Sequence, residues 1–569
     1  MDAKRLQATT LLIKRLHADY PTKGFKISPS IDFVTQSNSG LSIVAKQRIK
    51  KDDILIVIPE AARLTAKTVL PSSFLKKLKR DIANKSQFQE HQQMLNPSDY
   101  SLAVAIMKVL GRKANNDRYD DFHVCMSQTW PSEEAMKDSS WFYWDVASVQ
   151  KVWNRSGMFN IFEELRANVD STFNNIIYPI LRNNPDEYID ESLPSSQDDA
   201  ATPKDKLYNT FRYSLALLYS RAHECYDDDE PSGELVPIVD LFNGHSDKID
   251  EAIKKGKTNE KSVINVNIVS GKWPFIRGSM FRNDCNLPCS AVYANRDIDG
   301  GEELIISYGD LSPTGFAFKY GFIPMDFIKH HNIMSDVSIF CDPKLIPDDK
   351  MRRRCLERSG YPLDEFKRNK KLALGHFTWR ADSVEHYMRG YESEVIGSMR
   401  HFIIVGSCEL MKDELNRNYS TGKLRGALYN SEAFLRLYDL FDYNIEILGG
   451  DATSADDADK ASSPDTPSWE KCCLLARITY RESLLMWQRA VALKAQDAID
   501  SAPMLAIQFG WEIRNSDMHS LKGCQVCGRS YPELKCAKCK SVGREVQYCC
   551  RGHQVLGWRE HKTVCGKKL

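Results

Sequence analysis

The pattern of apolar and polar positions predicts paired strands at two places along the chain. Segments 41–45 and 54–58 are rich in β-branched residues and are separated by a polar turn. Segments 290–294 and 304–307 repeat this arrangement around Asp299-Gly300-Gly301. Each pair of segments is therefore expected to form a β-hairpin, one near each end of the first 310 residues.

Helical periodicity dominates most of the remaining chain. Apolar residues recur three and four positions apart in segments 100–110, 211–222, 383–418 and 469–495. The first of these helices is expected to end at Gly111, because glycine commonly follows a helix C-terminus. The predicted fold class is α+β, with a β-rich first part that contains a helical insertion and mostly helices after Phe322.

Two polar segments, 191–206 and 451–468, combine Asp, Ser, Pro and Ala with few apolar residues. Neither can bury enough apolar surface to offset the entropy lost on ordering, so both are predicted to be flexible loops. The charged run 247–262 is interpreted as a solvated insertion between core elements.

Length and composition place the chain among multi-domain globular proteins. At roughly 150 residues per domain, a chain of 569 residues corresponds to about three or four domains. Its 42% apolar and 27% charged residues exclude collagen-like and wholly disordered chains. No apolar run is long enough for a membrane helix, and the first residues lack the apolar core of a secretory signal. We therefore expect a cytoplasmic or nuclear protein with reduced cysteines and no membrane partner.

The net charge of +1 conceals a division between the tail and the rest of the chain. From His519 to Leu569 there are 11 Lys and Arg and 3 Asp and Glu, which gives +8 and leaves −7 for the first 518 residues. Of the 16 cysteines, 7 lie between Cys524 and Cys565. The tail is therefore expected to be a separate module.

Cysteine and histidine spacing in the tail predicts two zinc sites. The order is C-x2-C-x8-C-x2-C-x9-C-x3-H-x7-H-x3-C. The eight candidate ligands are Cys524, Cys527, Cys536, Cys539, Cys549, His553, His561 and Cys565. Eight soft ligands suit two tetrahedral Zn²⁺ ions, and a segment with so little aliphatic core would fold by binding metal. With no open coordination position, both sites would be structural.

This tail closely resembles a MYND finger, on the residues Tyr548-Cys549, His553-Gln554, His561-Lys562 and Cys565. The resemblance implies interleaved ligand sets and a peptide ligand that contains proline. One set is Cys524, Cys527, Cys549 and His553, and the other is Cys536, Cys539, His561 and Cys565. Position 553 is usually cysteine in the family, and Cys550 is the spare ligand if His553 does not bind. The basic surface favours an acidic peptide, with nucleic acid as the less favoured partner.

The run VPIVDLFNGHS, residues 236–246, is the most informative internal segment. Taken alone, it predicts an apolar strand ending in Asp240, Asn243 and His245, which would either line a pocket or simply cap the strand. It resembles the Pro-x-x-Asp-x-x-Asn-His motif of SET-domain methyltransferases, especially the Rubisco large-subunit lysine methyltransferase type.

Further matches to that family follow in the expected order. They are Asn38-Ser39-Gly40-Leu41 before the first SET strand, the helix 211–222, the strand leading to Tyr308, and Tyr320-Gly321-Phe322. The resemblance covers about residues 25–325 and, more loosely, the helical stretch to about 510. It implies an S-adenosylmethionine-dependent protein lysine N-methyltransferase with a protein substrate.

The resemblance also implies a role for each matching residue. Tyr308 would be the catalytic residue that orients the amine and the methyl group. The residues expected to bind the cofactor are Asn38, Ser39, Gly40, Leu41, Arg221, Asp240, Asn243, His245 and Tyr320, and those expected to line the substrate channel are His223 and Phe322.

The chemistry explains why such residue types are needed. The methyl group of the sulfonium is transferred to a neutral amine, so a lysine with an ordinary pKa near 10.4 must lose its proton, which an apolar channel favours. Positioning supplies much of the acceleration, and carbonyl and tyrosine oxygens can contact the polarised methyl hydrogens.

Several departures from the family pattern keep a second function open. Asn38 replaces a glycine, Gly244 separates Asn243 from His245 where the family has Asn-His, and Ser312-Pro313 replaces Ser-Asn. A catalytically weak scaffold that binds peptides through the finger is the alternative. His223 matches neither the lysine nor the histidine branch of the family, so a histidine N-methyltransferase also remains open.

These features together give three expected domains. Residues 25–325 would form the SET domain, with a helical insertion at about 60–210. Residues 326–512 would form a mostly helical substrate-binding domain with an acidic loop at 451–468, and residues 519–569 the MYND finger.

Overall fold

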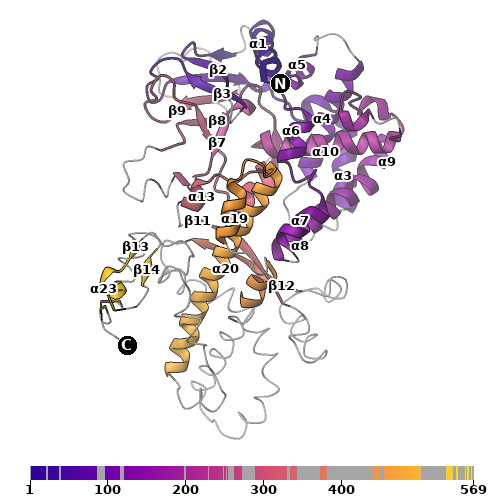
Figure 1. Ribbon diagram of the computed structural model, residues 1–569. Coiled ribbons are helices and arrows are strands. Elements are labelled where there is room, and N and C mark those ends of the chain that lie inside the picture. The colour runs from indigo at the N-terminus through magenta and orange to yellow at the C-terminus, as the bar shows by residue number, and fades with distance from the viewer. Residues whose placement is uncertain are drawn as a thin grey trace. The chain divides into compact units, whose positions relative to one another are not determined.

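Figure 1 shows the computed structural model of the protein. The described residues are 2–20, 24–36, 40–85, 97–115, 121–154, 156–197, 200–227, 230–247, 249–250, 253, 262–271, 289–329, 333–341, 372–380, 438, 441–448, 454–501, 534–542, 546–548, 558, 561–562 and 565–566. The chain divides into two compact units. Unit 1 comprises Met1–Trp144, Glu163–Leu311 and Phe318–Phe322, and unit 2 comprises Asp145–Phe162, Ser312–Ala317 and Ile323–Leu569.

A four-stranded antiparallel sheet is the main β-structure of unit 1. Its order is β1 (Lys26–Ile27), β4 (Ile54–Pro59), β9 (Cys289–Ala294) and β8 (Val266–Gly271). The sequence of β4, ILIVIP, is apolar throughout, and every residue after the first is buried. A continuous apolar run of this kind is typical of a strand covered on both faces, and β4 is accordingly an inner strand.

Three two-stranded ribbons complete the strands of unit 1. They are β2 (Ile31–Gln36) with β3 (Gly40–Ala45), β5 (His223–Asp227) with β6 (Glu230–Glu234), and β7 (Asn243–His245) with β10 (Ile305–Ser307). The last pair is parallel, so residues far apart in the sequence are brought together at one end of β10.

The two predicted hairpins are wrong, although their strands exist. β3 pairs with β2, β4 pairs with β9, and β10 pairs with β7. The two strand–turn–strand units instead pair with each other: Ile49 and Ile298 exchange two backbone hydrogen bonds of 2.9 Å. β3 thus pairs with the strand that directly precedes it, whereas β4 pairs with β9, more than 200 residues away.

Helices fill most of the segment between β4 and β5. They are η1 (Glu60–Ala62), α2 (Ala66–Val69), α3 (Ser72–Lys85), α4 (Pro97–Asn115), α5 (Phe122–Ser127), α6 (Glu133–Ser139), α7 (Val146–Trp153), α8 (Gly157–Thr172), η2 (Phe173–Ile177), α9 (Tyr178–Leu181), η3 (Pro185–Glu187), η4 (Pro194–Ser196) and α10 (Pro203–Arg221). α1 (Asp2–Asp19) precedes the strands and was not predicted. Helices α4 and α10 pack against each other in the core of unit 1.

Local sequence accounts for the start of α10. Thr202 caps the helix, its hydroxyl accepting a hydrogen bond from Asp205 N at 3.3 Å, while the Asp205 carboxylate accepts one from Thr202 N at 3.0 Å. Proline at the first helical position is pre-organised for this geometry. The predicted flexible loop 191–206 therefore already contains η4 and the first turn of α10.

Gly111 does not end a helix, because α4 continues to Asn115. A Cβ atom at Gly111 would lie 2.3 Å from the Glu187 carbonyl oxygen. The glycine is needed for a close approach between the helix and this backbone, which periodicity alone could not indicate.

Unit 2 has a long helix, a shorter acidic helix and a β-ribbon. Its elements include α13 (Asp326–Lys329), β11 (Ile333–Cys341), β12 (Leu372–Arg380), α19 (Ser454–Ser462) and α20 (Ser468–Ser501), and α12 (Pro313–Tyr320) begins in it. β11 and β12 form an antiparallel pair in a region that was expected to be mostly helical. The predicted helix 383–418 lies outside the described residues.

The prediction of a flexible loop at 451–468 is wrong, because half of this segment, Ser454–Ser462, is the helix α19. Asp457, which is only 2% exposed, accepts hydrogen bonds from Arg477 and Arg481 of α20. These contacts order a segment whose composition alone favours disorder. None of the described helices has the length and apolar character that a membrane crossing requires.

Candidate functional site

Unit 1 contains a pocket of about 250 Å³ where the ends of several elements meet. Its walls come from the C-terminus of α10, the short helix η5 (Val239–Leu241), the end of β10 and the C-terminus of α12. The lining residues are Ser220, Arg221, Ala222, His223, Val239, Asp240, Phe242, Ile306, Ser307, Tyr308, Gly309, Lys319 and Tyr320. Five residues that the sequence predicted as site residues are thus brought together: Arg221, His223, Asp240, Tyr308 and Tyr320.

Tyr308 follows directly after β10 and is held on several sides. Its hydroxyl donates to the Phe242 carbonyl at 3.3 Å, and its backbone N–H donates to the His245 carbonyl at 2.9 Å. Its ring stacks on Tyr320 with a centroid distance of 4.1 Å and an interplanar angle of 14°. Burial raises the pKa of this tyrosine, so it is a neutral hydroxyl at neutral pH.

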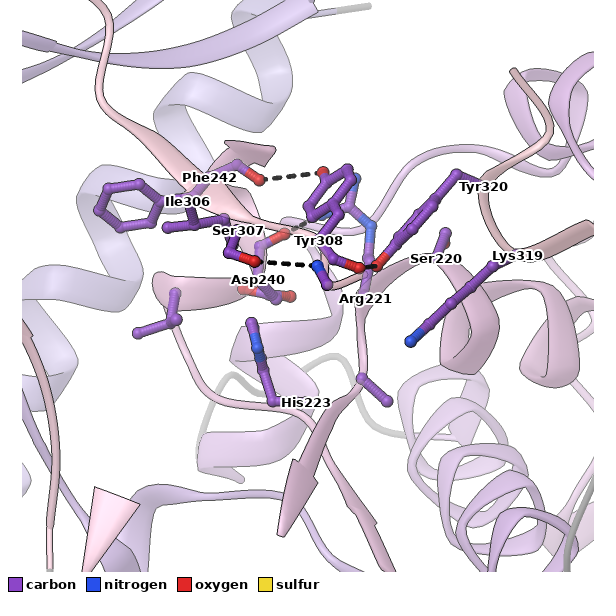
Figure 2. Close-up of a pocket in the computed structure, with 13 residues that line it drawn as sticks. Ser220, Arg221, His223, Asp240, Phe242, Ile306, Ser307, Tyr308, Lys319 and Tyr320 are labelled. Carbon is purple, nitrogen blue, oxygen red and sulfur yellow. Dashed lines mark hydrogen bonds between the residues drawn. The ribbon is translucent and has the colours of Figure 1, made fainter. Parts of the chain in front are cut away.

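Arg221 and Asp240 line the same pocket as Tyr308 (Figure 2). Arg221, the last residue of α10, donates from its guanidinium to the Asp240 backbone carbonyl. Asp240 is 5% exposed, and within the part of the chain that the structure describes neither of its carboxylate oxygens has a hydrogen-bond partner. Burial raises the pKa of Asp240 to about 6, and the positive charge of Arg221 opposes that rise.

His223 and Lys319 complete the polar lining. Burial, and secondly the Lys319 ammonium, lower the pKa of His223 to about 4, so the imidazole is neutral at pH 7. Lys319 Nζ lies 5.7 Å from the centroid of the Tyr320 ring. Sequence reasoning missed Lys319; its position one residue before Tyr320 in a short helix was the available signal.

Other predicted site residues do not line the pocket. The Asn243 side-chain amide donates to Glu303 Oε1 at 2.7 Å and to Ser42 Oγ at 3.2 Å. His245 lies in β7, where its carbonyl accepts from Tyr308. Leu41 is buried in β3, and Phe322 is 43% exposed.

The glycine-containing turn before the first SET strand is only partly described. Gly40 is the first residue of β3, and Asn38 and Ser39 lie outside the described residues. The run 236–246 was expected to be an apolar strand that ends in Asp240, Asn243 and His245, but Val239–Leu241 form a 3-10 helix and only its later part, Asn243–His245, is a strand. The turn of this helix carries Asp240 to the pocket wall.

A cluster of metal-ligand side chains lies in the tail. Cys536, Cys539, His561 and Cys565 offer four ligand atoms that all lie within 4.8 Å of one another. Cys536 Sγ lies 3.6 Å from Cys565 Sγ and 3.2 Å from His561 Nε2, and Cys539 Sγ lies 3.6 Å from the same nitrogen. These separations are close to the edges of a zinc tetrahedron, about 3.3–3.8 Å for bond lengths near 2.0–2.3 Å.

Short elements position this cluster. β13 (Leu534–Lys535) and β14 (Gln547–Tyr548) pair, and α23 (Ala537–Lys540) begins directly after Cys536. The N–H of Cys536 donates to the Val546 carbonyl at 2.8 Å. The four ligands are one of the two predicted sets, while Cys524, Cys527, Cys549 and His553 lie outside the described residues.

Comparison with known proteins defines the class of this fold. Residues 524–565 match the model of the MYND finger family. The structure is similar to solved SET-domain structures over 90% of this chain and 98% of theirs, with 14–15% identity. The protein therefore has a SET-domain methyltransferase fold and carries a MYND finger, which confirms both the predicted α+β fold and the predicted zinc module.

Individual relatives can now be named. The SET domain of LSMT bound to lysine and AdoHcy gives a TM-score of 0.53 at 15% identity. Rubisco LSMT bound to AdoMet gives 0.52 at 14% identity. The curated proteins Egl nine homolog 1 of Homo sapiens and of Mus musculus are 40% identical over 42 residues, which is 7% of this chain. The chain spans only about a tenth of the length of these curated relatives, 9% and 10%.

Proposed function

We propose that this protein is an S-adenosylmethionine-dependent protein lysine N-methyltransferase whose MYND finger binds a peptide of a partner protein. The observation that carries the proposal is the pairing of the Tyr308 hydroxyl with the Phe242 carbonyl, 3.3 Å apart, at a pocket of a SET-domain fold. Two oxygens at this spacing can contact one polarised methyl group.

The pocket fits the charges of the cofactor. The amino-acid end of S-adenosylmethionine carries an ammonium and a carboxylate, and its sulfonium supplies the methyl group. Among the described residues, neither the buried carboxylate of Asp240 nor the buried Nε of Arg221 has a hydrogen-bond partner. A cation beside Asp240 and an anion beside Arg221 would satisfy groups that are costly to bury alone.

The pocket residues would favour a neutral amine. Tyr308 would hold the substrate nitrogen in line through its hydroxyl, with the Phe242 carbonyl fixing the direction of that hydroxyl. His223 is uncharged at neutral pH and can accept a hydrogen bond from an incoming N–H. The nearby charge of Lys319 would further oppose a protonated lysine at this place.

The finger would bind two zinc ions. The first would be held by Cys536, Cys539, His561 and Cys565, whose ligand atoms converge. The second would be held by Cys524, Cys527, Cys549 and His553. Both sites have four protein ligands, so they would stabilise the fold and leave catalysis to the pocket.

A catalytically weak scaffold is the second candidate, and one contact favours it. Asn243, which the family resemblance assigns to the cofactor, hydrogen-bonds with Glu303 and Ser42 and does not line the pocket. In the scaffold, the finger would act by recruiting peptides and the pocket would bind no cofactor.

Calorimetry followed by mass spectrometry separates these functions. Titration with S-adenosylmethionine should give one binding site per chain, and Arg221→Met should weaken binding at least tenfold. Incubation with lysate and cofactor should then place the added methyl groups on lysine. Methylated histidine would favour the histidine branch, while absence of cofactor binding would favour the scaffold.

A further inference from the structure

Gly244 occupies a position with no room for any side chain. The residue lies in β7 between Asn243 and His245 and pairs with Ile306 of β10, without a bulge in the register. A Cβ atom at this glycine would lie 2.0 Å from Cδ1, 2.2 Å from Cε1 and 2.5 Å from Cγ of Tyr308. The ring of Tyr308 therefore lies directly against the backbone of Gly244.

A second aromatic ring also packs against Tyr308. Tyr320 stacks on the Tyr308 ring at 4.1 Å and 14°, close to the contact distance of two parallel rings. The Tyr308 hydroxyl donates to the Phe242 carbonyl (Figure 2). The ring therefore contacts Gly244, Tyr320 and Phe242, and the contacts with Tyr320 and Phe242 restrict its movement away from Gly244.

We propose that Gly244 is a positioning residue that fixes the plane of the Tyr308 ring and so the place of its hydroxyl. The extra residue between Asn243 and His245 is then explained by this contact: only glycine, which has no side chain, leaves room for the Tyr308 ring at this position. The effect of Gly244 on the reaction rate rests on the proposed methyl transfer. The contact between Gly244 and the Tyr308 ring is independent of that proposal.

The expected effect follows from the distances. Ordinary contact with a Cβ begins at 3.4 Å, so an alanine whose Cβ would lie 2.0 Å from the ring must displace it by more than 1 Å. A misplacement of about 1 Å can reduce a positioned reaction roughly 100-fold. Gly244→Ala should therefore lower kcat strongly, with much less effect on the KM for the cofactor.

A thermal-stability cycle tests the contact independently of activity. Gly244→Ala is expected to lower the melting temperature of the full chain, and to lower it much less in a Tyr308→Ala background, where the ring is absent. Equal losses in both backgrounds would overturn the proposal. This cycle remains informative if Gly244→Ala folds poorly, because the double variant should then recover folding.

A kinetic cycle tests the positioning role. In the presence of Tyr308, Gly244→Ala should reduce kcat at least tenfold; in a Tyr308→Phe background it should change the residual rate less than threefold. Loss of rate to the same extent in both backgrounds, or an unchanged kcat, would contradict positioning through Tyr308.

Gly300→Ala is the matched control. A Cβ at this glycine would meet its nearest atom, Gln47 Cα, at 3.4 Å, which is ordinary contact. Its rate and melting temperature should stay near those of the wild type. Failure of the proposed function would appear as a wild-type protein without methyl transfer, while the stability cycle would still decide the Gly244 contact.

Discussion

Asp240 brings a buried carboxylate to the pocket, and its raised pKa has a consequence for stability. The unfolded carboxyl ionises near pH 4 and the folded one near pH 6. Between these values the folded state binds more protons, so stability falls as pH rises from about 4 to about 6 and the cost persists above pH 6. Arg221 and Arg5 reduce this cost without cancelling it.

Asp240→Asn should therefore be more stable than the wild type at pH 7.5, by up to about 3 kcal/mol for a shift of roughly two pKa units. The difference should shrink toward zero at pH 4. Urea unfolding of both proteins at the two pH values measures it, and the other titrating groups cancel in the comparison. If the difference in unfolding free energy between the two proteins were the same at both pH values, ionisation of the Asp240 carboxyl would not destabilise the folded state, and the prediction would be contradicted.

Individual residues could be predicted from the sequence where a motif fixes them. Arg221, Asp240 and Tyr308 lie in matching motifs, and the pocket brings all three together. Lys319 was missed: its neighbour Tyr320 was the available signal, but its place in the pocket depends on where the end of α12 packs. Asn243 was assigned to the cofactor, but its side chain contacts Glu303, a partner 60 positions away in the sequence.

Helix α19 shows how a tertiary contact overrides composition at the scale of an element. Asp457 of this helix forms ion pairs with Arg477 and Arg481 of α20, and all three side chains are at least 90% buried. Removing the carboxylate would leave two guanidinium groups buried beside each other. Breaking such a buried pair typically costs about 3–5 kcal/mol.

Asp457→Ala should therefore destabilise unit 2 by several kcal/mol and release α19 from α20. Thermal unfolding measures the first effect, and hydrogen exchange over residues 454–462 the second. Asp459→Ala is the control, since Asp459 is an exposed carboxylate on the same helix. Equal stability of the two variants would contradict a structural role for the Asp457 cluster.

The positions of strands and helices along the chain were easier to predict than the elements with which they pair or pack. The apolar runs located β3, β4, β9 and β10 within one or two residues. The predicted pairing was wrong, because a polar turn indicates a change of direction but does not identify the partner strand: β3 pairs with the preceding strand β2, and β4 with β9, more than 200 residues away. The prediction of a loop at 451–468 was wrong because Arg477 and Arg481 of α20 bind Asp457 and order this segment. The composition of the segment gives no information about these distant arginines.

At the scale of the whole molecule, the finger should be separable from the SET-domain body. We expect about two zinc ions per chain, and His553→Ala should reduce this to about one. Cys550→Ser should retain two, because Cys550 is the spare thiol beside the proposed ligands. Metal analysis of the purified proteins gives these numbers. A loss of zinc in Cys550→Ser but not in His553→Ala would exchange the two assignments.

Metal removal should leave the body folded. The SET-domain pocket is built from residues of unit 1 before position 323, and none of these is a proposed zinc ligand. Two sequence signatures, the cysteine spacing for the finger and the ordered motifs for the SET fold, predicted modules that the comparisons also find, whereas the three domain boundaries stay predictions.

Methyl transfer from tritiated S-adenosylmethionine to proteins of a cell lysate, compared between wild type and Tyr308→Phe, tests the central claim most directly. The variant keeps the ring against Gly244 and Tyr320 and removes the hydroxyl that donates to Phe242. We predict labelled protein with the wild type and at least tenfold less with the variant, at equal cofactor binding. Equal labelling by both proteins would contradict the catalytic role of Tyr308, and no labelling by the wild type would contradict the proposed methyltransferase.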